Sequence, residues 1–266
     1  MELEDLSMDF QKLSKNIMSN KTRAFSLVEV LVAMIVGSLM VAAIYFAYSV
    51  FSKTYLTTIQ KISVNKNIRA GLSAISKDLR MASYYMPLPT TPTGYITSSF
   101  GSITTPIRIT QNINAPQAVD IIYDLEDRLL NNFSRIKITY SIDSNKDLIK
   151  SLLRCLDANC VNTVAPDNLR YFQSQKIAGP CEDLQFILIE TRNGIKEITT
   201  DVARVRNIYV NLLCTSTESV DFPGKDYNTG IPNVGGGRIL QNLNDGKYRD
   251  MMSVIVYPRN ILKPGV

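Results

Sequence analysis

The sequence predicts an α+β protein, in which a long N-terminal helix packs against an antiparallel β-sheet. Three observations predict this fold class. Residues 30–51 carry no charge and are mostly apolar. Apolar residues then recur at helical spacing up to Ala82, with no proline between Phe25 and Tyr85. The remaining residues contain short stretches in which apolar and polar side chains alternate, as in half-buried strands.

The uncharged stretch is long enough to cross a membrane. A helix of 22 residues rises about 33 Å, and the hydrocarbon core of a bilayer is about 30 Å thick. We therefore expect residues 25–52 to form a transmembrane helix, in preference to a buried helix of a soluble protein. Lys21 and Arg23 directly precede it. Basic flanks stay in the cytoplasm, so residues 1–24 are expected there and the rest of the chain on the other side.

The helix is expected to continue beyond the membrane as an amphipathic segment, residues 53–86. Its apolar stripe has 4-3-4-3 spacing, which is typical of one helix face, and consists of Ile68, Leu72, Ile75, Leu79 and Ala82. Charged residues lie off this stripe, namely Lys66, Arg69, Lys77, Asp78 and Arg80. Pro87 and Pro89 are expected to end the helix. The stripe packs either on a sheet of the same chain or in a coiled coil. Gly37 and Gly71 weaken the helix locally.

Residues 87–266 are predicted to form a β-rich globular domain. A turn is expected at residues 143–147, and residues 222–248 are expected to form one long surface loop. The alternating pattern predicts strands at 103–109, 119–125, 136–142, 148–153, 182–190, 205–213 and 252–256.

The four cysteines are expected to form disulfides, because a translocated domain faces an oxidising compartment. Four cysteines allow three pairings. We favour Cys155 with Cys160, which closes a short loop, and Cys181 with Cys214, which flank strands that would lie side by side. A zinc site is the alternative, but the spacing does not fit one.

Composition argues against several function classes. The chain has no histidine, which removes the usual general base and the commonest metal ligand. A formal net charge of +5, evenly spread, does not indicate nucleic-acid binding. The calcium-loop-like run Asp143-x-Asn145-x-Asp147 lacks the glycine and glutamate that such a loop needs. We expect no catalytic residue, no metal and no cofactor.

Glu29 is the one charged residue from Ala24 to Ser52, and an isolated carboxylate at membrane depth costs about 2.5–3.5 kcal/mol. The run Ala24-Phe25-Ser26-Leu27-Val28-Glu29, with its basic flank and apolar helix, resembles the processing site of type IV pilins and type II secretion pseudopilins. The resemblance implies that prepilin peptidase cuts between Ala24 and Phe25 and N-methylates the new Phe25 amine. It also implies that Glu29, fifth in the mature chain (29 − 24 = 5), pairs with the Phe25 amine of a neighbouring subunit during assembly.

The rest of the chain resembles the PilW-type minor pilins and, more distantly, the J-type minor pseudopilins. The segments that carry this likeness are residues 67–69, 78–82, 181–186, 205–213, 248–249 and 257–260. The resemblance implies a subunit that primes or caps a type IV pilus. Its implied partners are other minor pilins, the major pilin, prepilin peptidase, the inner-membrane assembly platform and the lipid bilayer.

Three other functions are weighed. The first is a minor pseudopilin of type II secretion or of DNA uptake, which the same processing site would serve. The second is an adhesive or ligand-binding module at a filament tip, with residues 222–248 as its contact surface. The third, a membrane-anchored enzyme, is disfavoured because no catalytic arrangement is recognisable.

Overall fold

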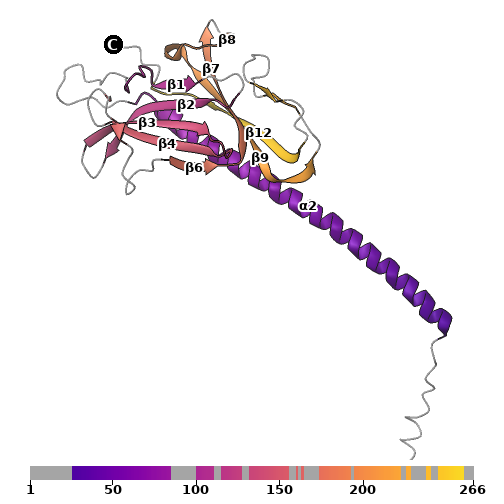
Figure 1. Cartoon of the computed structure of the whole chain (residues 1–266). Coiled ribbons are helices and arrows are strands. Elements are labelled where there is room, and N and C mark those ends of the chain that lie inside the picture. The colour runs from indigo at the N-terminus through magenta and orange to yellow at the C-terminus, as the bar shows by residue number, and fades with distance from the viewer. Residues whose placement is uncertain are drawn as a thin grey trace, which may run out of the picture. The chain divides into compact units, whose positions relative to one another are not determined.

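The computed structural model describes residues 26–84, 100–110, 115–127, 132–155, 160, 163–164, 174–192, 195–222, 226–228, 238–240 and 245–260. The chain divides into two compact units, Met1–Thr54 and Tyr55–Val266. The described residues of the first unit are Ser26 and the helix that follows it. The second contains the rest of that helix and all of the strands (Figure 1).

The helix, α2, extends over Leu27–Met81. It ends earlier than the prolines predict, because the chain turns away to follow a neighbouring strand. Ser83 has a φ of 64°, the left-handed conformation common just after helices. The backbone N–H of Ser83 then donates to the carbonyl of Ile122, 3.1 Å away. This bond fixes the path of the chain as it leaves the helix.

The strands form two main antiparallel sheets and one small ladder. The first sheet has the order β1-β2-β3-β4-β5, with β6 also paired to β4, and the second has the order β12-β9-β7-β8. The third is the pair β10-β11. Their bounds are β1 Ile107–Thr110, β2 Ala118–Asp127, β3 Asn132–Ile142, β4 Leu148–Cys155, β5 Thr163–Val164, β6 Ser174–Ala178, β7 Cys181–Arg192, β8 Ile195–Ile198, β9 Asn207–Phe222, β10 Tyr227–Asn228, β11 Ile239–Leu240 and β12 Gly246–Val256.

The sheets are joined through Gln117, just before β2. Its backbone N–H donates to the carbonyl of Leu184 at 2.9 Å, and its side-chain oxygen accepts from the N–H of Phe186 at 2.7 Å. Both partners belong to β7. A single sheet was expected, but the strand pattern of the sequence does not say where one sheet ends and the next begins.

The main hydrophobic core lies between the two sheets and the second half of α2. All five residues of the predicted stripe are buried, between 0% and 7% exposed. They pack with residues of both sheets, among them Ile121 and Ile138 of the first sheet and Leu184 and Leu212 of the second. The stripe therefore packs on sheets of the same chain, and the predicted α+β class is confirmed.

The region between residues 222 and 248 differs from the single loop that was expected. β9 continues to Phe222 and β12 begins at Gly246, because the two strands stay paired at their ends. Tyr227 and Asn228 pair with Leu240 and Ile239 in a short ladder. Residues 223–225, 229–237 and 241–244 lie outside the described part of the chain.

Gly71 is needed for close packing, although the sequence marks it only as a weak point of the helix. A Cβ added to Gly71 would lie 2.7 Å from a methyl carbon of Leu148 and 2.7 Å from one of Leu212. These leucines belong to different sheets. A valine here should overpack the core and lower the free energy of unfolding by about 1–3 kcal/mol, measurable by urea unfolding of the full-length chain.

Ala70→Val is the matched control for Gly71→Val. Ala70 is exposed on the same turn of the helix, so a valine there has the same β-branched side chain without the core contacts. We expect a loss of less than about 1 kcal/mol from helix propensity. Equal losses in the two variants would contradict the packing role of Gly71.

Candidate functional site

The first turn of α2 holds Glu29 next to a helix cap. The Ser26 hydroxyl accepts a hydrogen bond from the Glu29 backbone N–H at 3.2 Å. The Ser26 carbonyl also accepts from the N–H groups of Glu29 and Val30, at 3.0 and 3.2 Å. A serine three residues before a glutamate is typical of a helix N-terminus. Ala24 and Phe25, the predicted cleavage site, lie outside the described residues.

Glu29 stands on a helix segment whose other side chains are mostly apolar and exposed. Leu31, Met34 and Phe46 have between 52% and 71% of their surface exposed. Among the described residues, α2 is the one helix long and apolar enough to cross a membrane, and its most apolar stretch has no buried residue. Its length and composition suit such a segment to lipid, where an isolated carboxylate such as that of Glu29 would be costly.

A buried polar cluster fastens α2 to the first sheet, and the sequence did not predict it. Its centre is Asp78, which was placed off the apolar stripe but is 2% exposed. Its carboxylate accepts hydrogen bonds from the hydroxyls of Tyr123 at 3.1 Å and Tyr140 at 2.6 Å. The Lys150 ammonium lies 2.6 Å from the same carboxylate. Helix α2 is thereby joined to β2, β3 and β4.

The cluster keeps both tyrosines as hydrogen-bond donors. Burial, and then the negative charge of Asp78, raise the pKa of Tyr123 and of Tyr140 well above the ordinary value. Both hydroxyls therefore stay protonated well into the alkaline range, where an exposed tyrosine would lose its proton. Lys150 supplies the opposite charge that a buried carboxylate needs. We interpret this cluster as structural.

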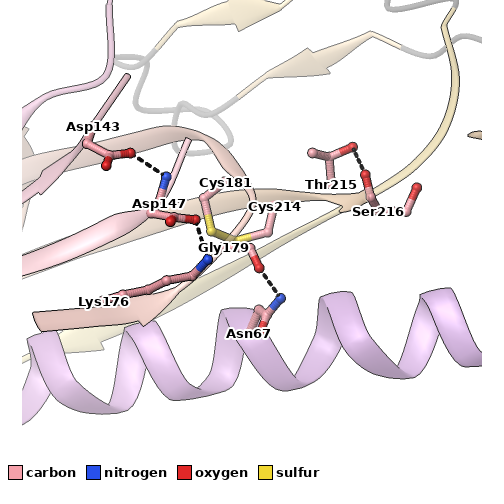
Figure 2. The surroundings of a disulfide bond; sticks show 9 residues. All are labelled: Asn67, Asp143, Asp147, Lys176, Gly179, Cys181, Cys214, Thr215 and Ser216. Atoms are coloured by element: carbon pink, nitrogen blue, oxygen red, sulfur yellow. Dashed lines mark hydrogen bonds and ion pairs between the residues drawn. A yellow bond between two sulfur atoms is a disulfide. The ribbon is translucent and has the colours of Figure 1, made fainter. Parts of the chain in front are cut away.

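The structure joins the cysteines in the two pairs that the sequence favours. Cys155 and Cys160 form one disulfide. Cys181 and Cys214 form the other, across the paired strands β7 and β9. Figure 2 shows the second disulfide close to the point where Asn67 of α2 reaches toward the sheets. The Asn67 side-chain nitrogen donates to the carbonyl of Gly179 at 2.7 Å.

The two disulfides should differ in their contribution to stability. They close loops with sequence separations of 33 and 5 residues. The chain-entropy relation then gives about 4 kcal/mol for Cys181–Cys214 and about 2 kcal/mol for Cys155–Cys160. We expect Cys181→Ser/Cys214→Ser to lower the urea midpoint by roughly twice as much as Cys155→Ser/Cys160→Ser. A larger loss from the second variant would contradict this account.

In the turn at residues 143–147, whose sequence resembles the start of a calcium loop, the Asp143 carboxylate binds backbone groups of the turn itself. Asp143 accepts hydrogen bonds from the backbone N–H groups of Asn145 at 2.9 Å and Asp147 at 2.7 Å. The Asp147 carboxylate also pairs with Lys176 at 2.7 Å, as Figure 2 shows. Within the described ranges, no three acidic or cysteine side chains gather as a metal site would require.

Comparison with known proteins identifies the N-terminal segment. Residues 19–45 match the family model described as the prokaryotic N-terminal methylation motif. No curated protein matches the chain. Among solved structures, a type IV-like pilin from Thermus thermophilus is similar, with a TM-score of 0.47 and 11% identity over 74% of this chain and 96% of that one. The matched segment includes Ala24, Phe25 and Glu29, so the predicted processing residues lie within this motif.

Proposed function

We propose that this protein is a PilW-type minor pilin, a structural subunit that primes or caps a type IV pilus together with other minor pilins and the major pilin. The observation that carries the proposal is the methylation motif at residues 19–45, with Glu29 in the first turn of an otherwise uncharged apolar helix. The sheets and disulfides then form the domain that follows the membrane segment.

Processing would release the group that Glu29 needs. Prepilin peptidase would cut between Ala24 and Phe25 and methylate the Phe25 amine. The positive end of the helix dipole stabilises Glu29 in part, but a carboxylate in lipid still lacks a counterion. In a staggered array of helices, the freed amine of one subunit meets the carboxylate of the next. Each charge is then costly in the isolated subunit and neutralised in the assembly.

The proposed location follows from the charges that flank the helix. Lys21 and Arg23 would hold the leader in the cytoplasm, so the chain would wait in the inner membrane with its β-rich domain outside the cytoplasm. The disulfides fit that placement, since they persist in oxidising compartments. From there the chain would enter the pilus through the assembly platform. The proposed role is structural and needs no catalytic residue.

The first test is the N-terminus of the mature chain. We expect mass spectrometry of the purified protein to find Phe25 as its first residue, carrying one N-methyl group. Phe25→Ala should still be cut, so it serves as a control for the mass assignment. A mature chain that retains residues 1–24, or one that begins after residue 51, would contradict the proposal.

A deletion experiment separates the machines that use such subunits. A minor pilin is needed for surface pili, so deletion of its gene should abolish them. A minor pseudopilin would instead be needed for secretion or for DNA uptake. Intact pili with lost secretion or uptake would favour that alternative, and intact pili with lost adhesion would favour a tip adhesin.

A further inference from the structure

The groove beside the C-terminal end of α2 carries three positive side chains and opens to solvent. It has a volume of about 550 Å³. One wall is the helix, and the other is the segment that follows β12. The lining residues are Ser73, Ser76, Lys77, Arg80, Met81, Tyr84, Arg259 and Asn260.

The three cations of the groove are exposed to solvent. They are Lys77, Arg80 and Arg259, and the described residues that line the groove include no acidic one. None of the three has an ion pair with another residue that the structure describes. Three like charges around one groove repel one another, and a bound anion would remove that cost.

The position of the helix end explains only part of this arrangement. Lys77 and Arg80 interact favourably with the negative end of the helix dipole. The helix dipole does not account for Arg259, because this residue lies in the segment after β12 and not in α2. Its neighbour Pro258 is buried, which fixes Arg259 at the groove. The Tyr84 carbonyl accepts from the Asp124 N–H at 2.8 Å, which fixes the helix side.

We propose that this groove binds an acidic segment of a partner polypeptide. Arginine and tyrosine beside the apolar Met81 are the side-chain types that dominate protein interfaces. The surface elsewhere exposes acids as well as bases, for example Glu197, Asp201 and Glu218. This mixed surface suits a short acidic peptide better than a long polyanion. The inference that the groove binds acidic residues is independent of the proposed function. Only the identification of the partner as another filament subunit rests on the proposed function.

The test uses the full-length chain in detergent micelles and two fluorescent peptides. One peptide is rich in glutamate, and the other has each glutamate replaced by glutamine. Binding is followed by fluorescence anisotropy at low salt and at about 0.15 M, where charges more than about 8 Å apart are screened. We expect the glutamate peptide to bind, the glutamine peptide to bind at least about tenfold more weakly, and salt to weaken the first.

Charge reversal in the groove is compared with charge reversal beside it. Arg80→Glu/Arg259→Glu changes two lining residues, and Lys66→Glu/Arg69→Glu changes two exposed cations of the same helix outside the groove. Both variants change the net charge equally. We expect about tenfold weaker binding for the groove variant, because charge reversal turns two attractive contacts with the acidic peptide into repulsive ones. The control should stay within about twofold.

Three results would overturn the inference. They are equal binding of the two peptides, equal loss in the two double variants, and tighter binding of duplex DNA or anionic lipid vesicles through Arg80 and Arg259. Circular dichroism checks that the variants remain folded. The peptide-binding test does not depend on filament assembly, so it can fail independently of the proposed function. The groove can bind the peptide even if Glu29 proves dispensable for assembly, and it can fail to bind the peptide even if Glu29 is essential.

Discussion

Replacing Glu29 with alanine should leave processing intact but keep the chain out of the filament. The cut between Ala24 and Phe25 lies outside the changed residue, so the mature N-terminus and its methylation should be normal. Incorporation should fall at least about a hundredfold, because losing one partner of a buried charge pair costs about 3–5 kcal/mol. The measurement is the amount of mature protein in sheared filaments relative to that in the membrane, by quantitative mass spectrometry.

Val30→Ala is the control for Glu29→Ala. Val30 is the next residue of the helix and is also exposed, and its change removes bulk without removing a charge. This variant should be incorporated at close to the wild-type level. If Glu29→Ala also reached that level, charge pairing would have no part in assembly.

Replacing Asp78 with alanine should be the most destabilising single change in the β-rich unit. It removes the acceptor of two tyrosine hydroxyls and the counterion of Lys150. Breaking a buried ion pair from one side costs about 3–5 kcal/mol, and buried hydroxyls left without an acceptor add to this loss. Urea unfolding measures it, followed by tyrosine circular dichroism, because the chain has no tryptophan.

Two further variants distinguish the loss of the Asp78 cluster from the general effect of removing a negative charge. Asp201→Ala removes a carboxylate from an exposed pair with Arg204, whose side chains are 52% and 65% exposed, and should cost less than about 1 kcal/mol. Asp78→Leu/Lys150→Met removes both charges, and should be less damaging than Asp78→Ala. If Asp78→Ala were as mild as Asp201→Ala, the cluster would not hold α2 to the sheet.

The stripe of α2 and the longer strands could be predicted because each follows a regular period. Ile68, Leu72 and Ile75 recur at helical spacing on the side that meets the sheets. In β3, Ile136, Ile138 and Tyr140 alternate with more polar residues and are all buried. A period of this kind survives in the sequence, because one face of the element must be apolar throughout.

Other features could not be predicted, because they depend on which elements meet. Strands of two to five residues, such as β5 and β10, are too short to show a period. Asp78 lies three residues after Ile75, at the edge of the buried stripe. This spacing could have predicted that Asp78 is buried, but its charge led to the expectation that it is exposed. The groove needs Arg259 beside Arg80, a juxtaposition that only the fold creates.

Zero-length carbodiimide cross-linking of purified assemblies tests the central claim most directly. We predict a covalent link between the Glu29 carboxylate of one subunit and the N-terminal amine of another, identified by mass spectrometry of assemblies that mix isotope-labelled and unlabelled subunits. The link should vanish in Glu29→Ala. Assemblies that never yield it, while Glu29→Ala enters them as readily as the unchanged chain, would contradict the account.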